Sequence, residues 1–136
     1  MIVVMASGGF DPVHVGHLNL LESAATRGSL LVALNSDLWL VKKKGYSVMP
    51  WADRARILSA LRVVDRVVAF DDDDGSVVDA LHRYRPHIFA NGGDRQAPDP
   101  REHAACRALG IEEWFDVGGA KIRSSSELVG RTRRSS

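Results

Sequence analysis

Short apolar runs alternate with longer amphipathic stretches along this chain, and the alternation predicts strands connected by helices. Such a rhythm is typical of βαβ units, in which a buried parallel sheet carries helices on both faces. We therefore expect an α/β fold with a doubly wound five-stranded parallel sheet. The predicted strands are Ile2–Ala6, Leu30–Leu34, Arg66–Phe70, His87–Ala90 and Glu113–Val117.

Apolar residues recur at helical spacing in the connections between these runs. Pro86 must end the third predicted helix, and Gly110 suits the C-cap of the fourth. A shorter fifth helix is expected within Ser124–Gly130. The residues that define the four main helices are Leu18, Leu21 and Ala25; Ile57, Leu58, Leu61 and Val64; Val78, Leu81 and His82; and Ala104, Ala105 and Leu109.

Composition favours one compact domain in residues 1–130, followed by a basic, serine-rich tail in residues 131–136. The chain has 136 residues and a net charge of +1, so neither a nucleic acid nor a membrane is expected as a partner. The single Cys106 cannot form an internal disulfide and is expected to be a packed thiol. The apolar start, Met1–Ala6, is too short to span a membrane, and a cytoplasmic location is expected.

Two glycines and two histidines stand in the loop after the first strand. Gly8 and Gly9 allow the backbone to approach a phosphate, and the following helix presents unpaired N–H groups to an anion. His14 and His17 are three residues apart, so both can face one triphosphate, and Gly16 keeps that face open. Taken alone, the glycine pair also suits a common turn after a strand. The histidine pair alone also suits two surface residues or half of a metal site. The loop matches neither GxGxxG nor GxxxxGK[ST].

The segment from Gly9 to His17 resembles the G-x-F-D-x-x-H-x-G-H signature of a nucleotidyltransferase superfamily. This superfamily includes glycerol-3-phosphate cytidylyltransferase, heptose-1-phosphate adenylyltransferase and phosphopantetheine adenylyltransferase. The resemblance extends from Ile2 to about Val129. It implies a Rossmann-like fold and in-line attack by an acceptor phosphate on the α-phosphorus of a nucleoside triphosphate. It also implies Mg²⁺, bound mainly through the nucleotide phosphates, and commonly a homodimer.

Residue roles follow from the resemblance, position by position. The catalytic candidates are His14, His17, Lys44 and Ser125. The nucleotide-binding candidates are Gly8, Gly9, Phe10, Gly16, Asn91, Gly93, Asp94, Lys121, Ser124 and Ser126. The substrate-binding candidates are Asp11, Asn35, Lys43, Trp51 and Arg54.

The serine segment near the C-terminus is similar to the I-S-T-T element that holds the β- and γ-phosphates in this superfamily. Serines before an apolar turn are also good helix N-caps. Cytidylyltransferases carry an arginine five residues before the first hydroxyl residue, where this chain has Gly119. Lys121 or Arg123 could replace that arginine.

Asn91–Arg95, after the fourth strand, is either a bare turn or the G-G-D element that lies beside the nucleoside in related enzymes. Lys42–Lys44 is either a solvated loop or a mobile basic loop that closes over anions. The resemblance implies that one of these lysines contacts substrate phosphate without identifying it, and we choose Lys44. Asp11 either binds metal or acceptor, or caps its loop. Trp51 either lines the acceptor pocket or packs on its helix. Asp71–Asp74 is expected to be a solvated loop with charge near a helix N-terminus.

These observations predict an enzyme that transfers a nucleoside monophosphate from ATP or CTP to a phosphorylated small molecule. A sugar phosphate is slightly favoured as the acceptor over a polyol phosphate or phosphonate. A glycerol-3-phosphate cytidylyltransferase-like activity is the alternative within the class. A non-catalytic nucleotide-binding module and a Rossmann-type redox protein are alternatives from other classes, and the second lacks its GxGxxG fingerprint.

Overall fold

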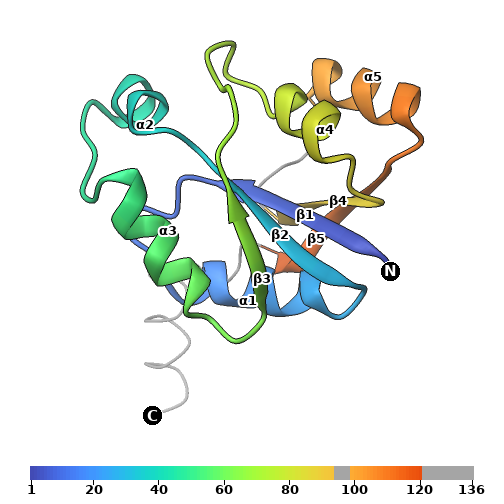
Figure 1. Ribbon diagram of the computed structural model, residues 1–136, viewed down its shortest axis with the longest axis horizontal. Helices are drawn as coiled ribbons and strands as arrows, with labels where there is room; N and C mark the ends of the chain where they lie inside the picture. Colours follow the sequence, from blue (N-terminus) through green and yellow to red (C-terminus); the bar gives the residue numbers. More distant parts are fainter. Residues whose placement is uncertain (94–98, 121–136) are drawn as a thin grey trace.

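The computed structural model describes residues 1–93 and 99–120, which form one parallel sheet with helices on both faces (Figure 1). The strand order is β3-β2-β1-β4-β5. The chain adds β2 and β3 on one side of β1 and then β4 and β5 on the other, so the topological switch point lies between β1 and β4. This confirms the doubly wound five-stranded fold. The strands are β1 (Val3–Gly8), β2 (Ser29–Leu34), β3 (Val64–Val68), β4 (Ile88–Gly93) and β5 (Glu112–Ala120). The helices are α1 (Val15–Ala25), α2 (Asp37–Lys44), α3 (Trp51–Ser59), α4 (Val78–Tyr84) and α5 (Pro100–Leu109).

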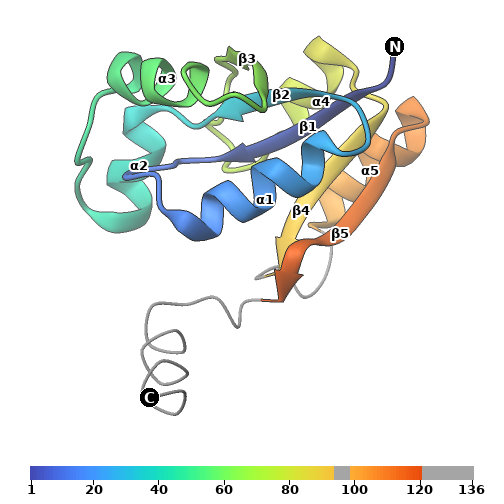
Figure 2. The ribbon, with the colours of Figure 1, turned by 90° about the horizontal axis from the view of Figure 1, so that it is seen from below.

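Alternate residues of the central strands feed two apolar layers, because successive side chains of a strand point to opposite faces. In β1, Val4 and Ala6 belong to the layer under α1 and α3, whereas Met5 belongs to the layer under α4 and α5. Figures 1 and 2 show α1 and the pair α4 and α5 on opposite sides of the sheet. Both faces are thus covered, as an all-parallel sheet requires.

The largest departure from the sequence prediction is α2, which occupies the segment expected to be a basic loop. Ser36 caps this helix by accepting a hydrogen bond from the Trp39 amide, and Gly45 ends it at φ 87°. The three lysines lie in its last turn, where positive charge complements the helix dipole. A solvated, mobile loop was therefore the wrong expectation.

The end of the second predicted helix also differs from the prediction. The helix expected to include Val64 ends at Ser59, and Val64 instead begins β3. The apolar spacing continued past the helix because both elements bury residues in the same layer. In α5, Asp99 is the N-cap and Gly110 ends the helix at φ 71°, as predicted.

Several predicted features lie outside the described residues. They are Asp94 and Arg95, Lys121 and Arg123, Ser124 to Ser126, the short helix within Ser124–Gly130, and the basic tail. Among the helices that the structure does describe, none has the length and apolarity needed to cross a membrane.

Candidate active site

The predicted nucleotide loop lies at the point where the strand order reverses. It leaves β1 at Gly8, runs to the start of α1 at Val15, and neighbours the end of β4, because β1 pairs with β4. Open parallel sheets bind ligands outside the carboxyl ends of the strands at this switch point. The fold therefore brings the loop 9–14 and the segment Asn91–Gly93 to the same edge of the sheet.

His14 and His17 form a reciprocal cap at the N-terminus of α1. The Nδ1 atom of His14 accepts a hydrogen bond from the Gly16 amide at 3.1 Å. The Nδ1 atom of His17 accepts one from the His14 amide, also at 3.1 Å. This is the capping-box arrangement with imidazoles in place of the usual hydroxyl and carboxylate.

The cap determines which ring nitrogen can face a ligand. Because both Nδ1 atoms accept main-chain hydrogen bonds, the proton of each neutral imidazole belongs on Nε2. The two rings stack with centroids 3.7 Å apart, and the Phe10 ring meets His17 edge-on at 4.8 Å. The helix start therefore presents two oriented N–H donors at the positive end of the helix dipole, which is an arrangement suited to a phosphate group.

Phe10 holds this loop in an uncommon conformation. Its φ is 48°, in the left-handed region, and its side chain is buried. Gly9, the residue before Phe10, packs closely against Leu40 of α2. A Cβ on Gly9 would come within 2.6 Å of Leu40 Cδ2. The glycine thus allows α2 to lie directly against the loop.

Asp11 ties the loop to the segment that follows α2. Its two carboxylate oxygens accept hydrogen bonds from the amides of Val48 and Met49 at 2.7 and 2.8 Å. Lys44 adds an ion pair at 3.2 Å and a bond to the Asp11 carbonyl at 2.9 Å. Burial raises the pKa of Asp11, but the two amides and Lys44 outweigh it and leave the pKa below its ordinary value. These contacts are those of a loop cap. A role for Asp11 toward metal or acceptor, and for Lys44 in catalysis, stays a prediction.

Arg54 is completely buried beneath the same loop. Its guanidinium donates to the carbonyl oxygens of Gly9, Asn35 and Met49 at 2.8 to 3.0 Å and pairs with Asp37. Three of these contacts hold backbone carbonyl oxygens and the fourth holds a carboxylate. The expected contact of Arg54 with substrate phosphate stays a prediction.

Asn35 and Asp72 join the carboxyl ends of β2 and β3. Asn35 Nδ2 donates to Asp72 Oδ2 at 3.0 Å, and Ser36 donates to the same carboxylate from its amide and its hydroxyl. Asp72 is 6% exposed, so the expectation of a fully solvated acidic run is wrong at this position. The isolated run of aspartates carried no signal that one member pairs with a distant asparagine.

Two tryptophans border the site. Trp51 Nε1 donates to the carbonyl of Leu34 at 3.1 Å, and its ring packs against the α1 and α3 layer. Of the two interpretations of Trp51, packing is therefore observed. Trp39, which the sequence prediction did not single out, lies beside Gly9. The Lys43 ammonium lies over the Trp39 ring, 4.6 Å from its centroid.

Asn91 contributes a buried donor at the end of β4. It is 6% exposed, and its Nδ2 atom has no hydrogen-bond partner among the described residues. An unpaired buried donor costs about 1–3 kcal/mol, which a bound ligand would recover. The partly buried Gly93 follows two residues later.

Cys106 has no part in this site. It is buried in the α4 and α5 layer, and burial, followed by the charges of Glu113 and Glu102, raises its thiol pKa to about 12. The expectation of a packed thiol is confirmed. Within residues 1–93 and 99–120, no three histidine, cysteine or acidic side chains are grouped so as to hold a metal ion.

Comparison with known proteins gives a consistent picture. Residues 5–127 match the family described as cytidylyltransferase-like. The chain is 37% identical over 139 residues to the bifunctional protein HldE of Streptomyces coelicolor and 41% identical over 125 residues to that of Methylobacillus flagellatus. These alignments cover 95% and 90% of this chain but 28% and 22% of those proteins. The chain thus spans about a quarter of the length of these relatives.

Solved structures agree on the fold. The lipopolysaccharide core biosynthesis protein from Thermoplasma volcanium is 27% identical with a TM-score of 0.72, and the match covers 85% of this chain and 93% of that one. A protein of unknown function from Archaeoglobus fulgidus is 17% identical with a TM-score of 0.54, over 82% of this chain and 95% of that one. The second match supports the fold alone.

Proposed function

The chain belongs to the cytidylyltransferase-like family and is a nucleotidyltransferase, and from this premise we propose that it transfers AMP from ATP to the phosphate of an aldose 1-phosphate. An acceptor phosphate oxygen forms a bond to the α-phosphorus. The bond from that phosphorus to the bridging oxygen of the β-phosphate breaks, and pyrophosphate leaves. The HldE relatives favour an acceptor of the heptose 1-phosphate class over glycerol 3-phosphate.

The capped pair His14 and His17 is the observation that carries this proposal. Both rings are held by main-chain bonds to Nδ1, so their Nε2–H groups are oriented before a ligand arrives. Preorganised donors stabilise charge that develops on the α-phosphate and the pyrophosphate, and each commonly contributes about 3 kcal/mol. A purely nucleotide-binding module would not need donors aimed at the reacting phosphate.

The nucleotide is proposed to lie between this helix start and the end of β4. The orphan Nδ2 donor of Asn91 supports a polar ligand atom there. Mg²⁺ is proposed to enter with the nucleotide and to be held mainly by its phosphates, where it would neutralise their charge. A homodimer, as in related enzymes, is proposed separately and can be checked by light scattering after gel filtration.

Pyrophosphate release tests the proposal directly. ATP and CTP are each combined with heptose 1-phosphate, glycerol 3-phosphate and a phosphonate acceptor, and the rate is measured for all six pairs. We expect the highest kcat/KM for ATP with heptose 1-phosphate. A preference for CTP with glycerol 3-phosphate would overturn the proposed substrates. Nucleotide binding without pyrophosphate release from any pair would support the non-catalytic module.

A further inference from the structure

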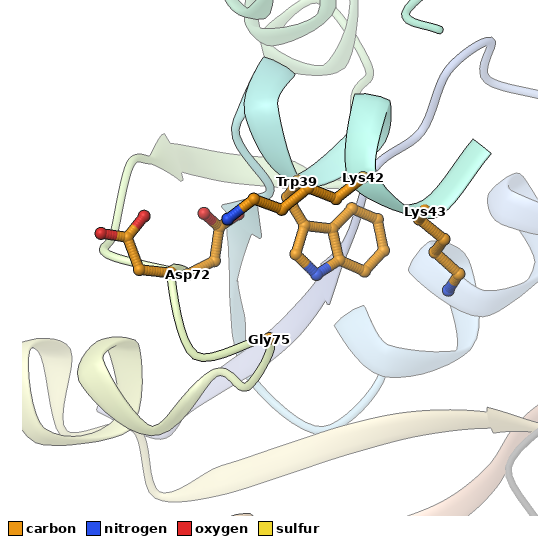
Figure 3. A pocket seen from close by; sticks show the side chains of 6 residues that line it. Trp39, Lys42, Lys43, Asp72 and Gly75 are labelled. Carbon is orange, nitrogen blue, oxygen red and sulfur yellow. The ribbon is translucent and has the colours of Figure 1, made fainter. Parts of the chain in front are cut away.

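We propose that a hollow between α2 and the acidic loop 71–75 binds the sugar moiety of the acceptor. This inference rests on the proposed function and adds residues that the signature motif does not contain. The hollow has a volume of about 340 Å³, within the range of small-molecule sites. Figure 3 shows its lining, which consists of Trp39, Lys42, Lys43, Asp72, Asp73 and Gly75.

The hollow adjoins the place where the phosphates would react. A Cβ on Gly9 would lie 3.5 Å from Cζ3 of Trp39, so the edge of the indole lies close to the signature loop. On the other side, the hollow ends at Asp72, which is fixed to the end of β2 through Asn35 and Ser36. The hollow therefore lies between the signature loop and the segment that follows β2.

The indole of Trp39 is the element best suited to a sugar ring. It is half-buried and presents a flat apolar surface, while Lys43 covers part of its ring at 4.6 Å from the centroid. The C–H face of a pyranose can pack on such a surface, and its hydroxyls then point outward to the rim. Lys43 lies on the opposite side of the indole from Lys42, which extends toward Asp72 (Figure 3).

The rim supplies groups for hydroxyl recognition. Lys42 offers N–H donors and Asp73 offers carboxylate acceptors, and both side chains are exposed without a side-chain hydrogen bond from the residues that the structure describes. A sugar hydroxyl donates and accepts, so it can use both. Asp72 already accepts three hydrogen bonds and forms a rigid wall.

The balance of charge distinguishes a sugar from a triphosphate. Two lysines and two aspartates line the hollow, so their formal charges cancel. A lining with no net charge offers no net attraction to a triphosphate, whereas its donors and acceptors suit an uncharged polyhydroxy group. The phosphate of the acceptor is best placed on the Lys43 side, which lies across the indole from Asp72 (Figure 3).

The test compares two variants of the hollow with matched controls. Trp39→Ala and Asp73→Asn should each raise the KM for heptose 1-phosphate about tenfold, which corresponds to about 1.4 kcal/mol, and leave the KM for ATP within about twofold. Leu38→Ala, on the same helix and 55% exposed, and Glu22→Gln, exposed on α1, should change neither constant. Calorimetric titration of heptose 1-phosphate without nucleotide gives a readout that does not depend on turnover.

The outcomes separate this inference from the proposed function. Suppose that the protein releases no pyrophosphate but binds heptose 1-phosphate, and that Trp39→Ala weakens this binding. That result would support sugar binding in the hollow and overturn the proposed transferase activity. Normal turnover with an unchanged acceptor KM in both variants would overturn sugar binding in the hollow and leave the proposed transferase activity in place. Equal losses in Trp39→Ala and Leu38→Ala would show that only the stability of α2 had changed, and would also overturn the hollow.

Discussion

The Nη1 atom of Arg54 donates to the carbonyl oxygen of Gly9 across 2.8 Å, although 45 residues separate them in the chain. The same nitrogen donates to the Asn35 carbonyl at 2.9 Å. One buried guanidinium thus fastens the ends of β1 and β2 to α3. The position of the signature loop depends on a side chain outside the signature.

Replacing Arg54 with lysine should destabilise the protein strongly. A lysine cannot make this forked set of bonds, so buried carbonyl oxygens and Asp37 would lose their partners. Leaving a buried carbonyl oxygen without a donor costs about 1–3 kcal/mol, and more than one is affected here. Urea unfolding of Arg54→Lys should show that loss, whereas Arg56→Lys, exposed on the same helix, should be near neutral. An unchanged unfolding free energy with a raised acceptor KM would instead support the predicted substrate contact of Arg54.

The histidine pair can be separated into its capping and catalytic roles. Asparagine is a strong N-cap, and glutamine at the third helical position can complete a capping box, so His14→Asn and His17→Gln keep the helix start. Both replace the imidazole N–H donor with a primary amide, which is a weaker donor and cannot carry a positive charge. We expect turnover to fall by about 10²–10³ for each, with a melting temperature close to that of the unmodified chain. Turnover within a few-fold of normal in either variant would refute the assigned role.

Asp11 should make stability depend on pH in the acid range. Its pKa in the folded state is below the ordinary value of 3.8, so its ionised form stabilises the fold. That contribution is complete above the unfolded pKa and disappears as the pH falls through the folded one. Asp11→Asn should therefore lower the urea midpoint at pH 7 by more than it does at an acid pH below the ordinary value of 3.8. An equal loss at both pH values would contradict the ionic role.

Gly118 and Gly119 form a matched pair for testing backbone strain. Their φ values are 85° and 91°, so an alanine is strained at either position by about 1 kcal/mol. A Cβ on Gly118 would also approach Leu20 backbone atoms to 2.9 Å, whereas none lies near Gly119. Thermal unfolding should show a clearly larger loss for Gly118→Ala than for Gly119→Ala. Equal losses would mean that β5 and α1 do not pack as described.

The elements of the sheet were predictable because their cause is local. The apolar runs of β1, β2 and β4 lie within a few residues of their predicted positions, and Gly110 ends α5 as its position indicated. The segment 37–44 was misjudged because its three lysines suggested a solvated loop, whereas Ser36 and Gly45 cap a helix there. The lysines suit its C-terminal turn, and only the two caps distinguish the two interpretations.

The sequence by itself determined the order of the strands and of four of the five described helices, the nucleotidyltransferase signature and the three-residue spacing of His14 and His17, since each depends on residues close together in the chain. The tertiary structure alone decided that Arg54 is a buried clamp, that Asp72 holds Asn35, and that Trp39 borders Gly9. In each of these relationships, the two residues stand at least 19 positions apart in the chain. Such contacts form only when the strands are laid side by side, because a side chain's burial and partners depend on which elements pack against it.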